Sequence, residues 1–142
     1  MSFLSKVSVR SPWLYRINAG SCNGCDVELA TTALIPRYDV ERLGCQYCGT
    51  PKHADIVLIT GPLTARIKDK VLQVYQEIPD PKVTVAVGIC PISGGVFRDS
   101  YAIEGPIDKY IDVDVNIPGC PPRPQAILEG IAMAIEIWKQ RL

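Results

Sequence analysis

Residues 55–60 read Asp-Ile-Val-Leu-Ile-Thr and residues 83–88 read Val-Thr-Val-Ala-Val-Gly, and these two stretches decide the fold. The first is a largely apolar run, which is typical of a strand buried on both faces of a sheet. The pair Gly61-Pro62 ends it. The second stretch is predicted to be another strand, and it leads directly to Cys90.

Two further segments complete the predicted sheet. Residues 13–18 and 113–117 alternate apolar and polar side chains, the pattern of a β-strand. Between the strands, residues 37–54 are expected to form a long surface excursion. Residues 91–112 are expected to be irregular, since glycine and proline pairs mark turns there.

Three helices are predicted between and after these strands. One runs from about Gly24 to Leu34, one covers residues 64–77 with apolar positions at helical spacing, and one begins at Pro124 and continues to the C-terminus. The alternation of strands and helices predicts a flavodoxin-like α/β fold, with a doubly wound parallel sheet covered on both faces. We expect residues 13–142 to form one domain, preceded by an N-terminal extension over residues 1–12.

The composition excludes some functions and leaves others open. The 142 residues carry 15 basic and 15 acidic side chains, so no nucleic-acid footprint is expected. No segment approaches the roughly 20 apolar residues of a membrane span, and we expect no signal peptide. A cytoplasmic chain that docks peripherally on a membrane partner remains compatible with this composition.

Four cysteines carry most of the chemical information, namely Cys22, Cys25, Cys90 and Cys120. The first pair forms a Cys-x-x-Cys loop, and each site follows a predicted strand. Ligands in parallel α/β folds bind outside the carboxyl ends of the strands, so the four thiolates should meet at that edge. They are therefore predicted to hold one 4Fe–4S cluster. Glycines beside them allow the backbone to approach the cluster sulfurs closely.

Other interpretations of the cysteines stay open from the sequence. A structural zinc ion could bind the two Cys-x-x-Cys pairs, Cys22 with Cys25 and Cys45 with Cys48, but this leaves Cys90 and Cys120 unexplained. Those two could also be small buried hydrophobes, and the first loop could cradle a flavin phosphate. Cys45 and Cys48 could form a disulfide, a second metal site or two free thiols.

Three motifs of this sequence resemble those of a known family. The motif Cys22-Asn-Gly-Cys25-Asp-Val-Glu28 resembles the small subunits of membrane-bound, energy-conserving group 4 NiFe hydrogenases. The segments around Gly88-Ile-Cys90 and Pro118-Gly-Cys120-Pro-Pro-Arg-Pro124 are similar to the same family. They also resemble the cluster-bearing subunit beside the quinone site of respiratory complex I. The complex I subunit has two adjacent cysteines in its first motif, so the Cys-Asn-Gly-Cys spacing favours the hydrogenase branch.

The resemblance implies a role as well as a fold. It implies that the cluster is the last relay before a large catalytic subunit, which in hydrogenases holds nickel and iron. It also implies a ferredoxin-like subunit with two clusters as electron donor, and membrane-embedded subunits that translocate ions. The chain would then sit on the cytoplasmic face of the membrane and do no bond-making itself.

The sequence also suggests roles or positions for Glu28, Arg123 and His53. By the same resemblance, Glu28 is associated with proton movement toward the active site; alternatively it is a carboxylate in the first turn of a helix. Arg123 could balance the charge of the cluster or pair with a partner subunit. His53 is expected to be a surface histidine, although its loop resembles one near the quinone pocket of complex I.

The sequence thus predicts an electron-transfer subunit of a ferredoxin-dependent, hydrogen-evolving, ion-translocating NiFe hydrogenase. A first alternative is the same relay feeding reduction of sulfane sulfur or quinone. A second alternative is a zinc-stapled structural module with no role in electron transfer.

Overall fold

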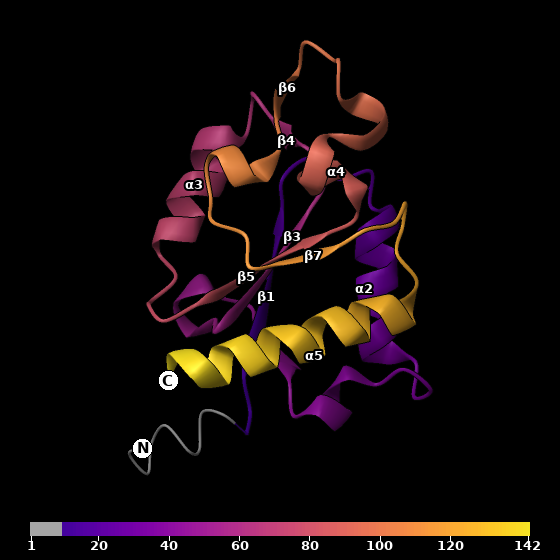
Figure 1. Cartoon of the computed structure of the whole chain (residues 1–142), viewed down its shortest axis with the longest axis vertical. Coiled ribbons are helices and arrows are strands. Elements are labelled where there is room, and N and C mark those ends of the chain that lie inside the picture. Colours follow the sequence, from indigo (N-terminus) through magenta and orange to yellow (C-terminus); the bar gives the residue numbers. More distant parts are fainter. Residues whose placement is uncertain (1–9) are drawn as a thin grey trace.

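The computed structural model describes residues 10–142, and its centre is a five-stranded parallel sheet (Figure 1). The strand order is β2-β1-β3-β5-β7, which is the 2-1-3-4-5 order of flavodoxin-like folds. The strands are β1 (Trp13–Asn18), β2 (Gln46–Tyr47), β3 (Ile56–Thr60), β5 (Val83–Val87) and β7 (Val115–Ile117). The predicted fold class is therefore confirmed.

Helices cover both faces of this sheet. They are α2 (Gly24–Leu34), α3 (Lys68–Gln76), α4 (Ile89–Ser93) and α5 (Pro124–Arg141). Side chains of α2 and α5 share one buried core with one face of the sheet, while α3 contributes to the core on the other face. Figure 1 shows α2 and α3 on opposite sides of the strands. The order of the strands and this covering make the sheet doubly wound, as predicted.

The two stretches that decide the fold are the central strands β3 and β5. All ten of their residues are buried, which is why their apolar runs do not alternate. Two threonines in these strands keep polar contacts inside the protein. Thr84 lies with its Oγ1 atom 3.0 Å from the hydroxyl of Tyr75 on α3. Thr60, the last residue of β3, bonds to a carboxylate near the cysteines, as described below.

Residues 37–54 differ from the predicted surface excursion. The segment contains two 3₁₀ helices, Val40–Leu43 and Pro51–His53, and the short edge strand β2 between them. Val40, Cys45 and Ala54 are buried, with at most 1% of their surface exposed. The local pattern did not show this, because β2 has only two residues and owes its place to its pairing with β1.

Two other predicted segments also gain structure. The helix expected over residues 64–77 begins only at Lys68, because Leu63–Thr64 form a strand, β4, that pairs antiparallel with β6 (Ile103–Gly105). The segment expected to be irregular, 91–112, contains most of α4, the strand β6 and two 3₁₀ helices, Gly95–Phe97 and Ile107–Lys109. Pairing between distant segments, which no local signal reveals, accounts for the β4–β6 ribbon.

None of the helices within residues 10–142 is long and apolar enough to cross a membrane. Most of the predicted N-terminal extension, residues 1–9, lies outside the described residues. The first strand, β1, begins at Trp13.

Close packing fixes α5 against β7 through a glycine. A Cβ atom placed on Gly130 would lie 2.3 Å from Cδ1 and 2.5 Å from Cγ1 of Ile117, which is buried in β7. This contact sets the distance between the last helix and the last strand, and Cys120 belongs to the short loop that joins them.

We expect Gly130→Val to destabilise the folded chain by more than about 2 kcal/mol, because the added methyl groups overpack the contact with Ile117. Urea unfolding followed by circular dichroism measures the change. Met133→Val, on the exposed face of the same helix, is the matched control and should cost less than about 1 kcal/mol. Equal losses in the two variants would contradict the packing argument.

Candidate metal centre

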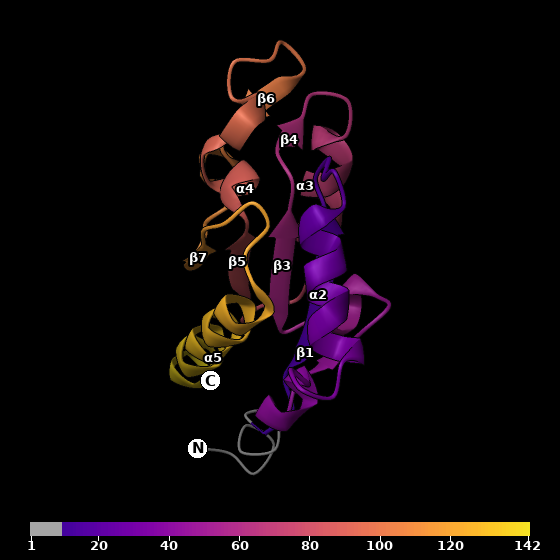
Figure 2. The same cartoon turned by 90° about the vertical axis from the view of Figure 1, so that its right-hand side faces the viewer.

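The four predicted ligands lie together at the carboxyl edge of the sheet. Cys22 and Cys25 follow β1, Cys90 is the second residue of α4 directly after β5, and Cys120 follows β7. The loops that bear them lie at the same end of the sheet in Figure 2. Parallel strands in neighbouring positions explain this convergence, because all their carboxyl ends meet at one edge.

Backbone hydrogen bonds join the last two of these loops. The amide of Gly88 donates to the carbonyl of Ile117 at 2.8 Å, and the amide of Ile89 donates to the carbonyl of Gly119 at 2.9 Å. They extend the pairing of β5 with β7 past the ends of the strands. The loop before Cys90 is thereby held beside the loop before Cys120.

Glycine at position 88 leaves space for the segment that bears Cys22 and Cys25. Gly88 has a φ of 93°, and a Cβ atom there would lie 2.6 Å from the Sγ atom of Cys25. A Cβ atom on Gly95 would lie 3.3 Å from the Sγ atom of Cys90. Any other residue at position 88 would both strain the backbone and displace a predicted ligand.

Burial and neighbouring charge raise the pKa values of two of the four thiols. Burial raises the pKa of the Cys25 thiol to about 11, and the negative charges of its neighbours add to the rise in the order Cys90, Cys22, Asp26 and Cys120. The pKa of Cys90 is also raised, first by burial and then by the charges of Cys120 and Cys22. Four cysteine sulfurs are the usual donor set of a 4Fe–4S cluster, so the residues present are of the type that such a cluster needs.

The zinc alternative based on both Cys-x-x-Cys pairs does not fit the structure. Gln46 pairs with Trp13 at the start of β1, so the neighbouring Cys45 lies near that end of the strand, whereas Cys22 follows the other end. The six residues of β1 separate the two ends by roughly 20 Å, at about 3.3 Å per residue. Within residues 10–142, no group of three or more Cys, His, Asp or Glu side chains, the four predicted ligands included, is spaced to hold a single metal ion.

Cys45 and Cys48 are free thiols in this structure. Burial raises the pKa of Cys45 to about 11. The pKa of Cys48 is raised as well, mainly by burial, and its Sγ atom donates to the carbonyl of Thr50 at 3.4 Å. Of the three alternatives that the sequence left open for this pair, the disulfide is absent, since Cys45 and Cys48 are not bonded to each other.

Glu28 is half-buried on α2, three residues after Cys25. It is the fifth residue of that helix, so it does not belong to the first turn, and the acidic residue of the first turn is Asp26. The alternative interpretation of Glu28 as a first-turn carboxylate is therefore wrong. The structure does not test the proton role.

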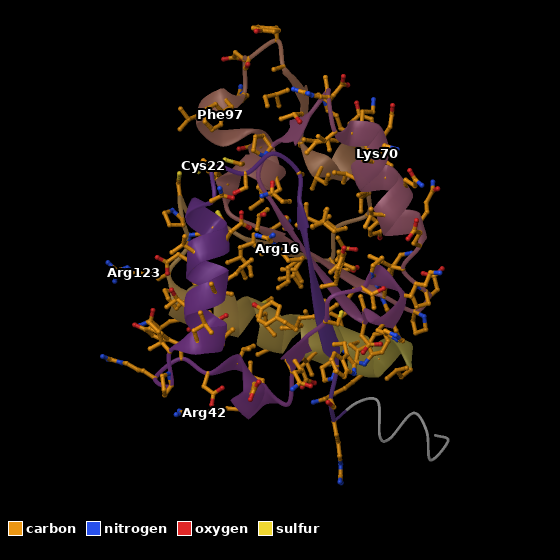
Figure 3. All side chains as sticks on the ribbon, turned by 180° about the vertical axis from the view of Figure 1, so that it is seen from behind. Arg16, Cys22, Arg42, Lys70, Phe97 and Arg123 are labelled. Atoms are coloured by element: carbon orange, nitrogen blue, oxygen red, sulfur yellow. The ribbon has the colours of Figure 1, made fainter. Side chains whose placement is uncertain are left out.

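The two other singled-out residues are exposed. Arg123 immediately precedes α5 and points away from the fold (Figure 3). His53 is exposed at the end of a 3₁₀ helix, as predicted, and lines a cavity of about 660 Å³ with Trp13 and Asp55.

Asp26 is a residue whose importance the sequence argument missed. Its side chain is 7% exposed and accepts bonds from Arg16 at 3.0 Å, Asn18 at 3.1 Å and Thr60 at 2.8 Å. Asn18 also accepts hydrogen bonds from the amides of Gly20 and Ser21, at 2.9 and 2.8 Å. The sequence does show a carboxylate, Asp26, directly after the predicted ligand Cys25. The partners of that carboxylate lie on two strands and become its neighbours only in the folded chain.

Comparisons with known proteins show which chains this one is similar to. A family model described as "NADH ubiquinone oxidoreductase, 20 Kd subunit" matches residues 22–134. A probable membrane-bound hydrogenase subunit, mbhJ, of Pyrococcus furiosus is 52% identical over 133 residues, which cover 94% of this chain and 79% of that protein. Formate hydrogenlyase subunit 7 of Escherichia coli is 45% identical; the match covers 99% of this chain but only 54% of that protein, so the chain spans about half its length.

A solved structure is similar as well. In the membrane-bound sulfane sulfur reductase, an archaeal respiratory membrane complex, one chain superimposes with a TM-score of 0.82 and 36% identity. The superposition covers 96% of this chain and 75% of that chain. Since the family model extends from the first predicted ligand into α5, over well more than half of the sequence, the chain belongs to the NADH ubiquinone oxidoreductase 20 Kd subunit family.

Proposed function

We propose that this chain is the electron-relay subunit of a membrane-bound, ion-translocating NiFe hydrogenase that evolves hydrogen with electrons from ferredoxin. Cys22, Cys25, Cys90 and Cys120 would hold one 4Fe–4S cluster. The observation that carries the proposal is the meeting of the segments that bear four cysteines at one edge of the parallel sheet. The relatives support the kind of complex, since one is named a membrane-bound hydrogenase subunit and another a formate hydrogenlyase subunit.

The residues of this chain have separate tasks in that role. The four cysteine thiolates hold the group, and Gly88 and Gly95 let the backbone come close to two of them. The burial of Cys25 keeps water away from one side of the site. When bound, a 4Fe–4S cluster supplies reversible transfer of one electron, at a potential that hydrogen bonds, burial and nearby charge adjust.

The partners proposed for the chain follow from the family resemblance. They are a large catalytic subunit with a nickel–iron site, a ferredoxin-like subunit with two clusters, and membrane-embedded subunits that move ions. The chain would bind peripherally on the cytoplasmic face of the membrane. Isolating the complex from its native source and identifying its subunits tests this set of partners directly.

A second candidate function is favoured by one observation, the similarity to a chain of the sulfane sulfur reductase complex. The same relay would then serve reduction of sulfane sulfur. Nickel analysis of the isolated complex, together with assays of hydrogen evolution and of sulfane-sulfur reduction, separates the two. Nickel with hydrogen evolution supports the hydrogenase, whereas sulfane-sulfur reduction without nickel supports the second candidate.

We expect the anaerobically purified protein to contain about four irons and four acid-labile sulfides per chain, with the EPR signal of a reduced cubane after dithionite. Cys25→Ser and Cys90→Ser should each lose most of this iron and signal, because each removes a thiolate ligand. Cys48→Ser is the matched control and should retain both. One zinc per chain and no sulfide would show that the electron-transfer proposal is wrong.

We also propose that Glu28 moves protons between the interior of the complex and its surface. Glu28→Gln should lower the hydrogen-evolution rate of the assembled complex by at least about tenfold, since proton transfer by a positioned side chain contributes a hundredfold or more. The cluster content and its EPR spectrum should not change. Glu129→Gln, at an exposed position of α5, is the control, and equal rates in both variants would rule out the proton role.

A further inference from the structure

Between the Cys22–Cys25 loop and the sheet lies a buried polar contact centred on the carboxylate of Asp26. Its three partners belong to the strands: Arg16 and Asn18 to β1 and Thr60 to the end of β3. A carboxylate that is 7% exposed is costly to bury unless such donors surround it. Asp26 directly follows Cys25 in the chain, so this contact lies beside a predicted ligand.

The start of α2 lacks a side-chain cap. Its N-cap, Asn23, has a left-handed conformation with a φ of 68°, and its side chain makes no capping hydrogen bond. The fixed points are instead Asn18, which accepts bonds from the amides of Gly20 and Ser21, and Asp26 in the first turn. Asn18 also donates to Asp26 at 3.1 Å, so one amide side chain joins both ends of the loop.

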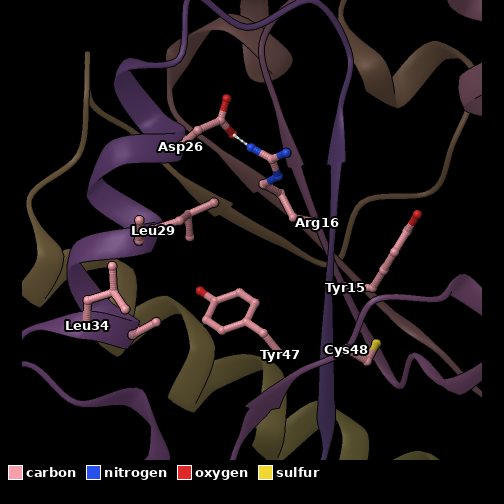
Figure 4. A pocket seen from close by; sticks show the side chains of 9 residues that line it. Tyr15, Arg16, Asp26, Leu29, Leu34, Tyr47 and Cys48 are labelled. Carbon is pink, nitrogen blue, oxygen red and sulfur yellow. Dashed lines mark ion pairs between the residues drawn. The ribbon is translucent and has the colours of Figure 1, made fainter.

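The same contact places two opposite charges beside Cys25. Arg16 approaches Asp26 through Nη1 at 3.0 Å, and its side chain is 45% exposed on the wall of a cavity of about 570 Å³ (Figure 4). Asp26 directly follows Cys25 in α2, so its carboxylate lies close to that cysteine. Arg16 pairs with this carboxylate and brings a positive charge to the same place.

We propose that Asp26 is a positioning residue that fixes the Cys22–Cys25 loop on the sheet, and that the Arg16–Asp26 pair sets the reduction potential of the group held there. The inference rests on the proposed function, because it concerns a 4Fe–4S cluster on these cysteines. Reduction adds one negative charge. A lone Asp26 carboxylate therefore opposes reduction, and a lone Arg16 guanidinium favours it.

The test is an EPR redox titration of the full chain, in complex with its partners, for the wild type, Arg16→Gln, Asp26→Asn and the double variant. Arg16→Gln should lower the potential and Asp26→Asn should raise it. Each should change the oxidised-to-reduced ratio at a fixed potential by about tenfold, or about 59 mV for a one-electron couple. The double variant should return toward the wild type, because neither charge remains unpaired.

A structural role alone would not move the two potentials in opposite directions. Shifts of the same sign, or unchanged potentials in loaded variants, would overturn the inference while leaving the proposed function intact. A wild-type protein without a cluster would overturn both. If Asp26→Asn does not fold, Arg16→Gln and Arg16→Lys decide the matter: the first must lower the potential, and the second, which keeps the charge, must leave it close to the wild-type value.

The positioning role has an independent readout. Asn18→Ala removes the amide that joins Asp26 to Gly20 and Ser21, so a chelator should extract iron from this variant at least about threefold faster than from the wild type. Asn116→Ala, at an exposed position of β7, is the matched control and should lose iron at the wild-type rate. Equal rates for all three proteins would contradict the positioning role.

Discussion

The meeting of four cysteines at one edge of the parallel sheet is the constraint on which the rest of this structure depends. Burial and the charges of neighbouring cysteines raise the pKa values of Cys25 and Cys90. The space left by the missing side chain of Gly88 and the hydrogen bonds between the loops after β5 and β7 keep these cysteines close together.

The sheet supplies the means of bringing these thiols together. In a parallel sheet every strand ends at the same edge, so β1, β5 and β7 deliver their loops to one place although they are distant in sequence. The central strands β3 and β5 are wholly buried and give the edge a rigid base. Asp26 then connects the Cys22–Cys25 loop to the sheet, and one of its hydrogen-bond donors is Thr60 at the end of β3.

The parts of the fold that could be predicted are those with strong local patterns. The strands 55–60 and 83–88 and the helix that begins at Pro124 were recovered within about one residue. The edge strand β2 and the β4–β6 ribbon were missed, because strands of two or three residues carry no periodicity and exist through pairing with distant partners. At the site, the cysteines were found from spacing, whereas Asp26 was not, since its partners become neighbours only on folding.

The sequence by itself determined the order of β1, α2, β3, α3, β5, β7 and α5 and the residue types at the sheet edge, because apolar runs and Cys-Gly-Pro spacings are local properties. Only the tertiary structure decided that Cys45 lies near the opposite end of β1 from Cys22. It also decided that Arg16 and Thr60 converge on Asp26. These facts depend on strand order and register, which the packing of the whole chain selects.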